Sequence, residues 1–141
     1  MSRIFWDTML FVYWFEDHPR YAPRVIQILA RMKERNDEWF TSSLAVGEVL
    51  VGPYKLRSER VAQQMEEFFR SPSVRIVPFT AAAAIRYAKI RAHLKVSPAD
   101  AVHLACAAEA GTDLFLTNDS SLLRKPIPGI QFIDDLDTRL L

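Results

Sequence analysis

Four carboxylates in this 141-residue chain have positions that suit metal chemistry. Two follow strand-like segments and two lie in predicted helices that follow loops; they are Asp7, Asp119, Glu48 and Asp100. Ligand crevices of open parallel sheets form at the carboxyl ends of the strands, so we expect these side chains to converge there. Four carboxylates in one crevice cannot all remain ionised without a cation. An all-oxygen set is typical of Mg²⁺ or Mn²⁺, because zinc and copper sites usually include softer ligands.

Each carboxylate also has a purely structural interpretation. Asp7 is a favoured type of residue for a helix N-cap, and Asp119 for a turn. Asp100 lies three residues after Ser97 and could complete the cap of its helix. Glu48 lies in an otherwise apolar stretch, where an unpaired carboxylate is costly, so its structural alternative is an ion pair with an arginine. Only the set of four favours a metal site over these alternatives.

Four further polar residues are candidates for orienting a metal shell, its waters or a substrate: Thr117, Asn118, Ser43 and His103. His103 lies one turn after Asp100 and could face the crevice, although a packed helix residue is the commoner role for such a histidine. The other three are equally good cap or turn residues. The histidines show no paired metal-binding spacing such as HExxH.

Strand-like and helix-like segments alternate along the chain and predict one α/β domain spanning residues 1–141. The predicted strands are 3–6, 38–41, 74–77, 114–117 and 130–133. The predicted helices are one directly after Asp7, then 20–36, 44–50, 56–70, 80–94, and one from Pro98 to near Gly111. We expect Gly52-Pro53 to end the third of these helices. This order implies a parallel sheet covered by helices on both faces.

Composition and charge bear on the localisation of the protein and on how it could bind a polyanion. The net charge is +1, so no global positive field attracts nucleic acid, and such a substrate must depend on local basic residues. Cys106 is the only cysteine, which excludes an intrachain disulfide. The apolar start is interrupted by Asp7 and lacks a small-residue cleavage site, and no apolar run approaches the ~18 residues that span a bilayer. We expect a cytoplasmic protein with no membrane partner.

Four motifs in register resemble those of the PIN-domain ribonucleases, especially the VapC-type toxins. They are Ile4-Phe5-Trp6-Asp7-Thr8, the segment 43–50, the segment 97–105 and Leu116-Thr117-Asn118-Asp119. The resemblance covers nearly the whole chain and implies a PIN-like domain with sheet order 3-2-1-4-5. It also implies Mg²⁺- or Mn²⁺-dependent endoribonuclease activity on RNA, homodimerisation, and inhibition by a small cognate antitoxin similar to VapB. The family's acidic residues correspond to Asp7, Glu48, Asp100 and Asp119.

The chain departs from the family pattern in its aromatic residues. Trp6 is bulky for the position before the first Asp, and the first helix carries Phe11, Tyr13, Trp14 and Phe15. An exposed part of this aromatic cluster would be a groove for a partner. We favour a core role for the cluster.

The hypothesis for the chemistry is metal-assisted hydrolysis, in which one or two ions polarise the scissile phosphate and activate a water molecule. Asp7, Asp100 and Glu48 are the expected main ligands, and Asp119 is expected to act through water or a second ion. One rival is a Mg²⁺-binding phospho-acceptor domain, which needs a lysine after a later strand; Lys125 is the only candidate. The other is a non-catalytic binding module whose acids serve as caps and ion pairs.

Overall fold

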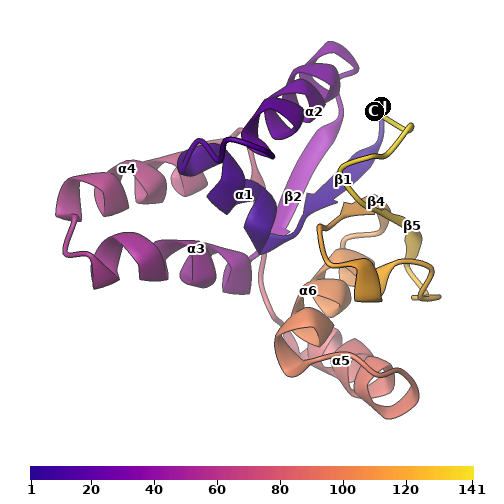
Figure 1. The fold of residues 1–141 in the computed structure, drawn as a ribbon. Helices are drawn as coiled ribbons and strands as arrows, with labels where there is room; N and C mark the ends of the chain where they lie inside the picture. Colours follow the sequence, from indigo (N-terminus) through magenta and orange to yellow (C-terminus); the bar gives the residue numbers. More distant parts are fainter.

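A five-stranded parallel sheet forms the centre of the computed structural model, which describes all 141 residues (Figure 1). The strands are β1 (Arg3–Trp6), β2 (Glu38–Ser42), β3 (Arg75–Val77), β4 (Thr112–Leu116) and β5 (Ile130–Asp134). Their order is β3-β2-β1-β4-β5, and every neighbouring pair is parallel. This confirms the predicted α/β class and strand order. It differs from the order 2-1-3-4-5 of typical phospho-acceptor domains.

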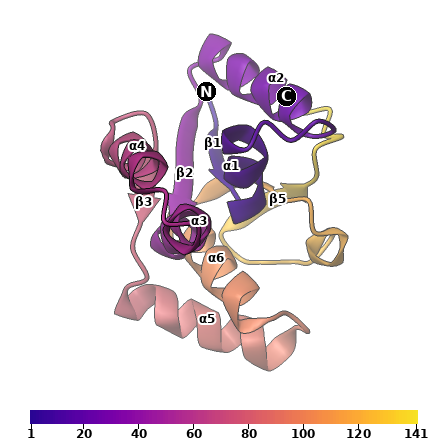
Figure 2. The same cartoon turned by 60° about the vertical axis from the view of Figure 1, so that its left-hand side comes forward.

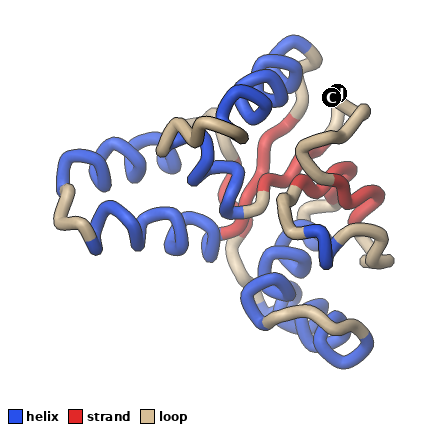
Figure 3. The backbone as a smooth tube through the Cα atoms, in the orientation of Figure 1, coloured by secondary structure: helices blue, strands red, loops and turns tan.

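Helices cover both faces of the sheet (Figures 1 and 2). They are α1 (Thr8–Phe15), α2 (Ala22–Glu34), α3 (Ser43–Lys55), α4 (Glu59–Arg70), α5 (Ala81–His93) and α6 (Pro98–Glu109), with a short 3₁₀ turn at Ser120–Leu122. Helices α5 and α6 pack together on one face, whereas α1 to α4 lie on the other, and α3 and α4 project from the sheet as a pair (Figure 3). No helix is both long enough and apolar enough to cross a membrane.

The alternation of side chains along β1 divides the core into two parts. Ile4 and Trp6 point to one side and contribute to a cluster with α1, α2, α3 and α4. Phe5 points to the other side and joins a cluster built largely from α6, where it stacks on Phe115 with ring centroids 5.0 Å apart. A strand apolar on both faces is expected at the centre of a doubly covered parallel sheet.

The aromatic residues of α1 belong mainly to the core, as expected. Phe11 is fully buried and contacts the rings of Trp6, Trp39 and Phe69, with centroid separations of 5.1, 5.7 and 5.3 Å. Trp14 and Phe15 are half-buried against the same cluster. The rings of α1 that pack in this cluster are therefore part of the core.

The prediction that Gly52-Pro53 ends a helix was wrong, because α3 continues through both residues to Lys55. A proline inside a helix removes one backbone donor and crowds the preceding turn. Here Pro53 lies in the last turn and is buried, and the helix closes normally with the Leu56 amide donating to the Gly52 carbonyl. The other predicted elements are present, with boundaries that differ by at most a few residues. Gly111 follows α6 with a positive φ of 68°, as predicted for a helix stop.

Candidate active site

Asp7 lies at the carboxyl end of the central strand and is almost fully buried. Its Oδ1 accepts a hydrogen bond from the Thr8 amide at 2.8 Å, so it is the N-cap of α1. Its Oδ2 accepts from the Thr117 hydroxyl at 2.7 Å. Asp7 is therefore a helix N-cap, as the structural interpretation has it. Each of its oxygens still keeps a lone pair for another partner. A buried carboxylate at the edge where parallel strands end remains a candidate ligand.

His103 lies in the site and is only 2% exposed. Its Nε2 is 2.7 Å from Glu48 Oε1, 3.3 Å from Thr8 Oγ1 and 3.9 Å from Asp7 Oδ1. Its Nδ1 is 2.7 Å from the hydroxyl of Ser42, the N-cap of α3. The imidazole therefore connects α6, α3, the end of β2 and the start of α1. The ring therefore faces the crevice, whereas the role favoured for His103 from the sequence was that of a packed helix residue.

Glu48 projects from α3 towards the same point. Its Oε1 accepts hydrogen bonds from Thr8 Oγ1 and is within 2.7 Å of His103 Nε2, whereas Oε2 has no protein partner. The partner of this carboxylate is therefore the His103–Thr8 pair, not the arginine of the structural alternative. One oxygen is fixed and the other is available to a ligand.

Asp100 lies in the first turn of α6, where its amide donates to the Ser97 hydroxyl at 3.1 Å. Burial raises the pKa of the Asp100 carboxyl above its ordinary value, and the negative charges of Asp7 and Asp119 raise it further. Ser97 and His103 act in the opposite direction. Asp100 thus lies within electrostatic reach of two of the other predicted ligands, and negative charge accumulates at this edge of the sheet.

Asp119 and Thr117 lie just beyond β4. The Asp119 carboxylate accepts from the amide and hydroxyl of Ser121 at 3.0 and 2.7 Å, which is the turn-forming role considered for it. The Asp119 amide donates to the Thr117 hydroxyl at 3.0 Å, and that hydroxyl in turn donates to Asp7. Thr117 therefore orients both aspartates, as predicted for a supporting hydroxyl.

Two of the supporting residues named from sequence lie elsewhere. Asn118 donates from Nδ2 to the Tyr13 hydroxyl at 2.9 Å. Ser43 is exposed, has no hydrogen bond to the carboxylates and lines a groove between α3 and α4. Ser42 and Thr8 make the contacts with the site instead. Neither was named as a candidate from the sequence, although their positions at the end of β2 and beside Asp7 were available signals.

The donor set fits a hard divalent cation, but the side chains do not form a closed cage. No three histidine, cysteine, aspartate or glutamate side chains are grouped closely enough to hold an ion by themselves. Mg²⁺ generally binds through one or two carboxylates and keeps several waters, so an open arrangement suits it better than a complete protein shell. The free oxygen of Glu48 and the accumulated charge around Asp100 are consistent with such a site.

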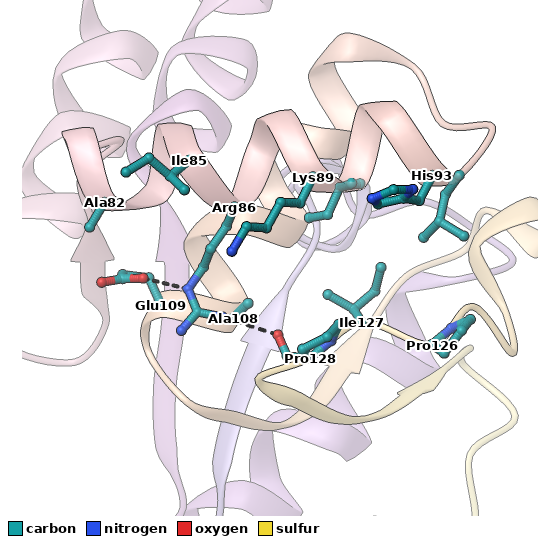
Figure 4. Close-up of a pocket in the computed structure, with 12 residues that line it drawn as sticks. Ala82, Ile85, Arg86, Lys89, His93, Ala108, Glu109, Pro126, Ile127 and Pro128 are labelled. Atoms are coloured by element: carbon teal, nitrogen blue, oxygen red, sulfur yellow. Dashed lines mark hydrogen bonds and ion pairs between the residues drawn. The ribbon is translucent and has the colours of Figure 1, made fainter.

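A cavity beside α5 is separate from this site. It measures about 650 Å³ and lies between α5, the end of α6 and the segment 126–128. Figure 4 shows Arg86, Lys89 and His93 of α5 facing Pro126 and Pro128, with Arg86 bound to Glu109. None of the four predicted acidic ligands lines it.

We expect Asp100→Asn to make the metal-free protein slightly more stable at pH 7. The folded-state pKa of Asp100 is raised, so ionisation above the unfolded-state pKa costs folding free energy, and the amide removes that cost. The gain should shrink as the pH falls towards 4, where wild-type Asp100 takes up its proton. Urea unfolding in EDTA at both pH values measures this difference. A variant no more stable than wild type at pH 7 would contradict the electrostatic description of the site.

Comparisons with known proteins identify the family and the fold of this chain. The sequence matches the PIN domain family over residues 4–127. No curated protein matches the chain. Among solved structures, VapBC2 from Rickettsia felis, bound to a promoter DNA fragment, has a TM-score of 0.71 at 21% identity, covering 94% of this chain and 98% of that chain. DNA-bound VapBC from Salmonella typhimurium has a TM-score of 0.70 at 25% identity, covering 96% and 99%.

A third similar structure is that of a toxin. VapC20 from Mycobacterium tuberculosis, a sarcin-ricin loop cleaving toxin, has a TM-score of 0.64 at 19% identity and covers 83% of this chain and 90% of that chain. The matched range spans the positions of all four predicted acidic ligands, and the solved structures share the fold of the whole domain. The chain therefore belongs to the PIN domain family and has the fold of the VapC toxins.

Proposed function

We propose that this protein is a Mg²⁺- or Mn²⁺-dependent endoribonuclease and the cytoplasmic toxin of a toxin–antitoxin pair. The observation that carries the proposal is the accumulation of carboxylates at one edge of the sheet. Burial raises the pKa of Asp100, and the charges of Asp7 and Asp119 raise it further. Glu48 lies within hydrogen-bonding distance of the histidine beside Asp7. Such a set of like charges favours a bound cation.

The solved relatives support the choice of RNA and of partner. VapC20 is described as cleaving the sarcin-ricin loop, and the Rickettsia and Salmonella structures are VapBC complexes. We therefore propose a structured RNA as substrate and a VapB-like antitoxin as inhibitor. A homodimer is also part of the proposal, on the family resemblance alone.

In the proposed mechanism Asp7, Glu48, Asp100 and Asp119 hold the ion, directly or through water. When bound, the ion would polarise the scissile phosphate and lower the pKa of a water molecule. The protein's own contribution is positioning: Thr117 orients Asp7 and the turn of Asp119. Thr8 donates from its amide to Asp7 and from its hydroxyl to Glu48, which fixes these two carboxylates relative to each other.

The test is cleavage of a mixed set of structured RNAs by purified protein with Mg²⁺, Mn²⁺ or EDTA. We expect cleavage with either metal, none in EDTA, and none by Asp100→Asn, because a neutral amide binds a divalent cation poorly. Metal should also raise the melting temperature of the wild type, since a ligand bound only by the folded state stabilises it.

Four outcomes would contradict parts or all of the proposal. If purified Asp100→Asn cleaved RNA at the wild-type rate, Asp100 would not be a metal ligand. If the wild type cleaved RNA in EDTA, the reaction would not require a metal. The absence of both RNA cleavage and a metal-induced shift in melting temperature would favour the non-catalytic binding module instead. Incubation with acetyl phosphate tests the other rival, which requires an aspartyl phosphate.

A further inference from the structure

We infer that His103 is a positioning residue for Glu48: it fixes Oε1 of that carboxylate and leaves Oε2 free for the proposed ion. The inference deepens the proposed function and rests on it for the identity of the ligand. Its basis is independent of any metal, because it follows from the contacts of the imidazole ring itself.

Both edges of the His103 ring are held by polar partners. Nδ1 lies 2.7 Å from Ser42 Oγ and Nε2 lies 2.7 Å from Glu48 Oε1. Ser42 caps α3 at the end of β2, and its Oγ already accepts from the Ala45 amide at 3.0 Å. The ring is therefore tied to a rigid point of the fold on one side and presents its other nitrogen to Glu48.

The hydrogen-bond network has one neutral arrangement that satisfies every partner. Since Ser42 Oγ accepts from Ala45, its own hydroxyl proton is free to donate to Nδ1 of His103. We accordingly assign the ring proton to Nε2, where it is donated to Glu48 Oε1. The Thr8 hydroxyl donates to the same oxygen at 2.7 Å. Two donors thus converge on Oε1.

Glu48 needs this support more than the other acidic residues do. Its side chain is 37% exposed and has several rotatable bonds, whereas Asp7 is short, buried and held on both oxygens. Fixing a flexible side chain before a ligand arrives reduces the conformational entropy lost on binding. Carboxylates that bind metals are commonly oriented by such hydrogen bonds from a surrounding layer of residues.

A packing role alone does not explain the position of His103. The following residues of α6, from Leu104 to Ala108, are all part of the apolar core on their face of the sheet. His103 is equally buried, yet its ring also has a serine, a threonine and two carboxylates as polar partners.

Two substitutions of His103 distinguish the role of its Nε2 from that of its Nδ1. His103→Gln places an amide N–H near the position of Nε2 and can still donate to Glu48, whereas His103→Asn is shorter and reaches only towards Ser42. We expect His103→Asn to weaken Mn²⁺ binding by about 10-fold or more, in the range typical for loss of a supporting partner. We expect His103→Gln to stay within about threefold of wild type.

The first measurement is Mn²⁺ titration monitored by the electron paramagnetic resonance of the free ion, without RNA. Thr8→Val, which removes the second donor to Oε1 with little change of shape, should also weaken Mn²⁺ binding. It provides the decisive comparison if a His103 variant fails to fold. Equal Mn²⁺ affinity of His103→Asn and wild type, or of Thr8→Val and wild type in that case, would overturn the inference.

Crystal structures of the metal-free variants give a second readout that does not depend on the proposed function. We expect the Glu48 carboxylate to keep its wild-type position in His103→Gln and to leave it in His103→Asn. If the wild type binds no Mn²⁺ and cuts no RNA, the proposed function fails, and these structures alone decide the positioning role. An unmoved Glu48 in His103→Asn would then overturn it.

Discussion

Asp7→Asn should lower RNA cleavage by at least about 100-fold and leave the fold intact. The loss follows if Asp7 is a direct ligand, because removing even a supporting partner of a metal site costs roughly 10- to 100-fold. The fold should survive because asparagine is as good an N-cap as aspartate for the Thr8 amide. The Thr117 hydroxyl can accept from the new amide in place of donating to Oδ2.

The matched control is Asp113→Asn. Asp113 is also an aspartate at a strand of the same sheet, but it lies near the start of β4 and accepts from the Arg3 amide. We expect its variant to cleave RNA like the wild type. The measurements are cleavage rates at saturating Mg²⁺ and urea unfolding in EDTA. If Asp7→Asn cleaved at the wild-type rate, Asp7 would be only an N-cap.

The positions of Asp7 and Asp100 were predictable because each is tied to a local backbone feature. Asp7 follows a short apolar strand, and Asp100 follows a Ser-Pro helix start, so their edge of the sheet is fixed once the strands are known to be parallel. The resemblance to the PIN domain family added the strand order, which local patterns do not determine. That order brings β1 and β4 together, and with them Asp7 and Thr117.

The contacts of His103 were less predictable because they are made by tertiary packing. Its partners Ser42 and Glu48 are 61 and 55 residues away in the sequence, and they meet it only because α6 packs beside β2 and α3. The sequence placed His103 one turn from Asp100 but did not show what lay opposite. The choice of Ser43 over Ser42 reflects the same difficulty, since one residue at a strand end changes the direction of a side chain.

The helix boundary near Pro53 shows a different limit of prediction from local sequence. A Gly-Pro pair disfavours a helix on local grounds, but propensity is outweighed when tertiary packing favours continuation. Pro53 is buried, and α3 packs along α4 over its length. The energetic penalty of one lost hydrogen bond near a helix end is small compared with the burial that the last turn provides.

Phe11→Ala should destabilise the protein by about 3–5 kcal/mol, the usual cost of removing a buried phenylalanine. Phe11 is 0% exposed and its ring lies among those of Trp6, Trp39 and Phe69, so truncation leaves a cavity that rigid neighbours cannot readily fill. Urea unfolding followed by tryptophan fluorescence measures the loss of stability, because Trp6 and Trp39 lie next to Phe11.

Leu56→Ala is the control for this prediction, since Leu56 is 82% exposed and its truncation should change stability by no more than about 0.5 kcal/mol. The pair also separates two roles for the aromatic residues of α1. A binding module acting through an aromatic groove requires them to be accessible, and Phe11→Ala would then reduce binding with little loss of stability. A loss of several kcal/mol would place Phe11 in the core, where it supports β1 and α1, the strand and helix that position Asp7.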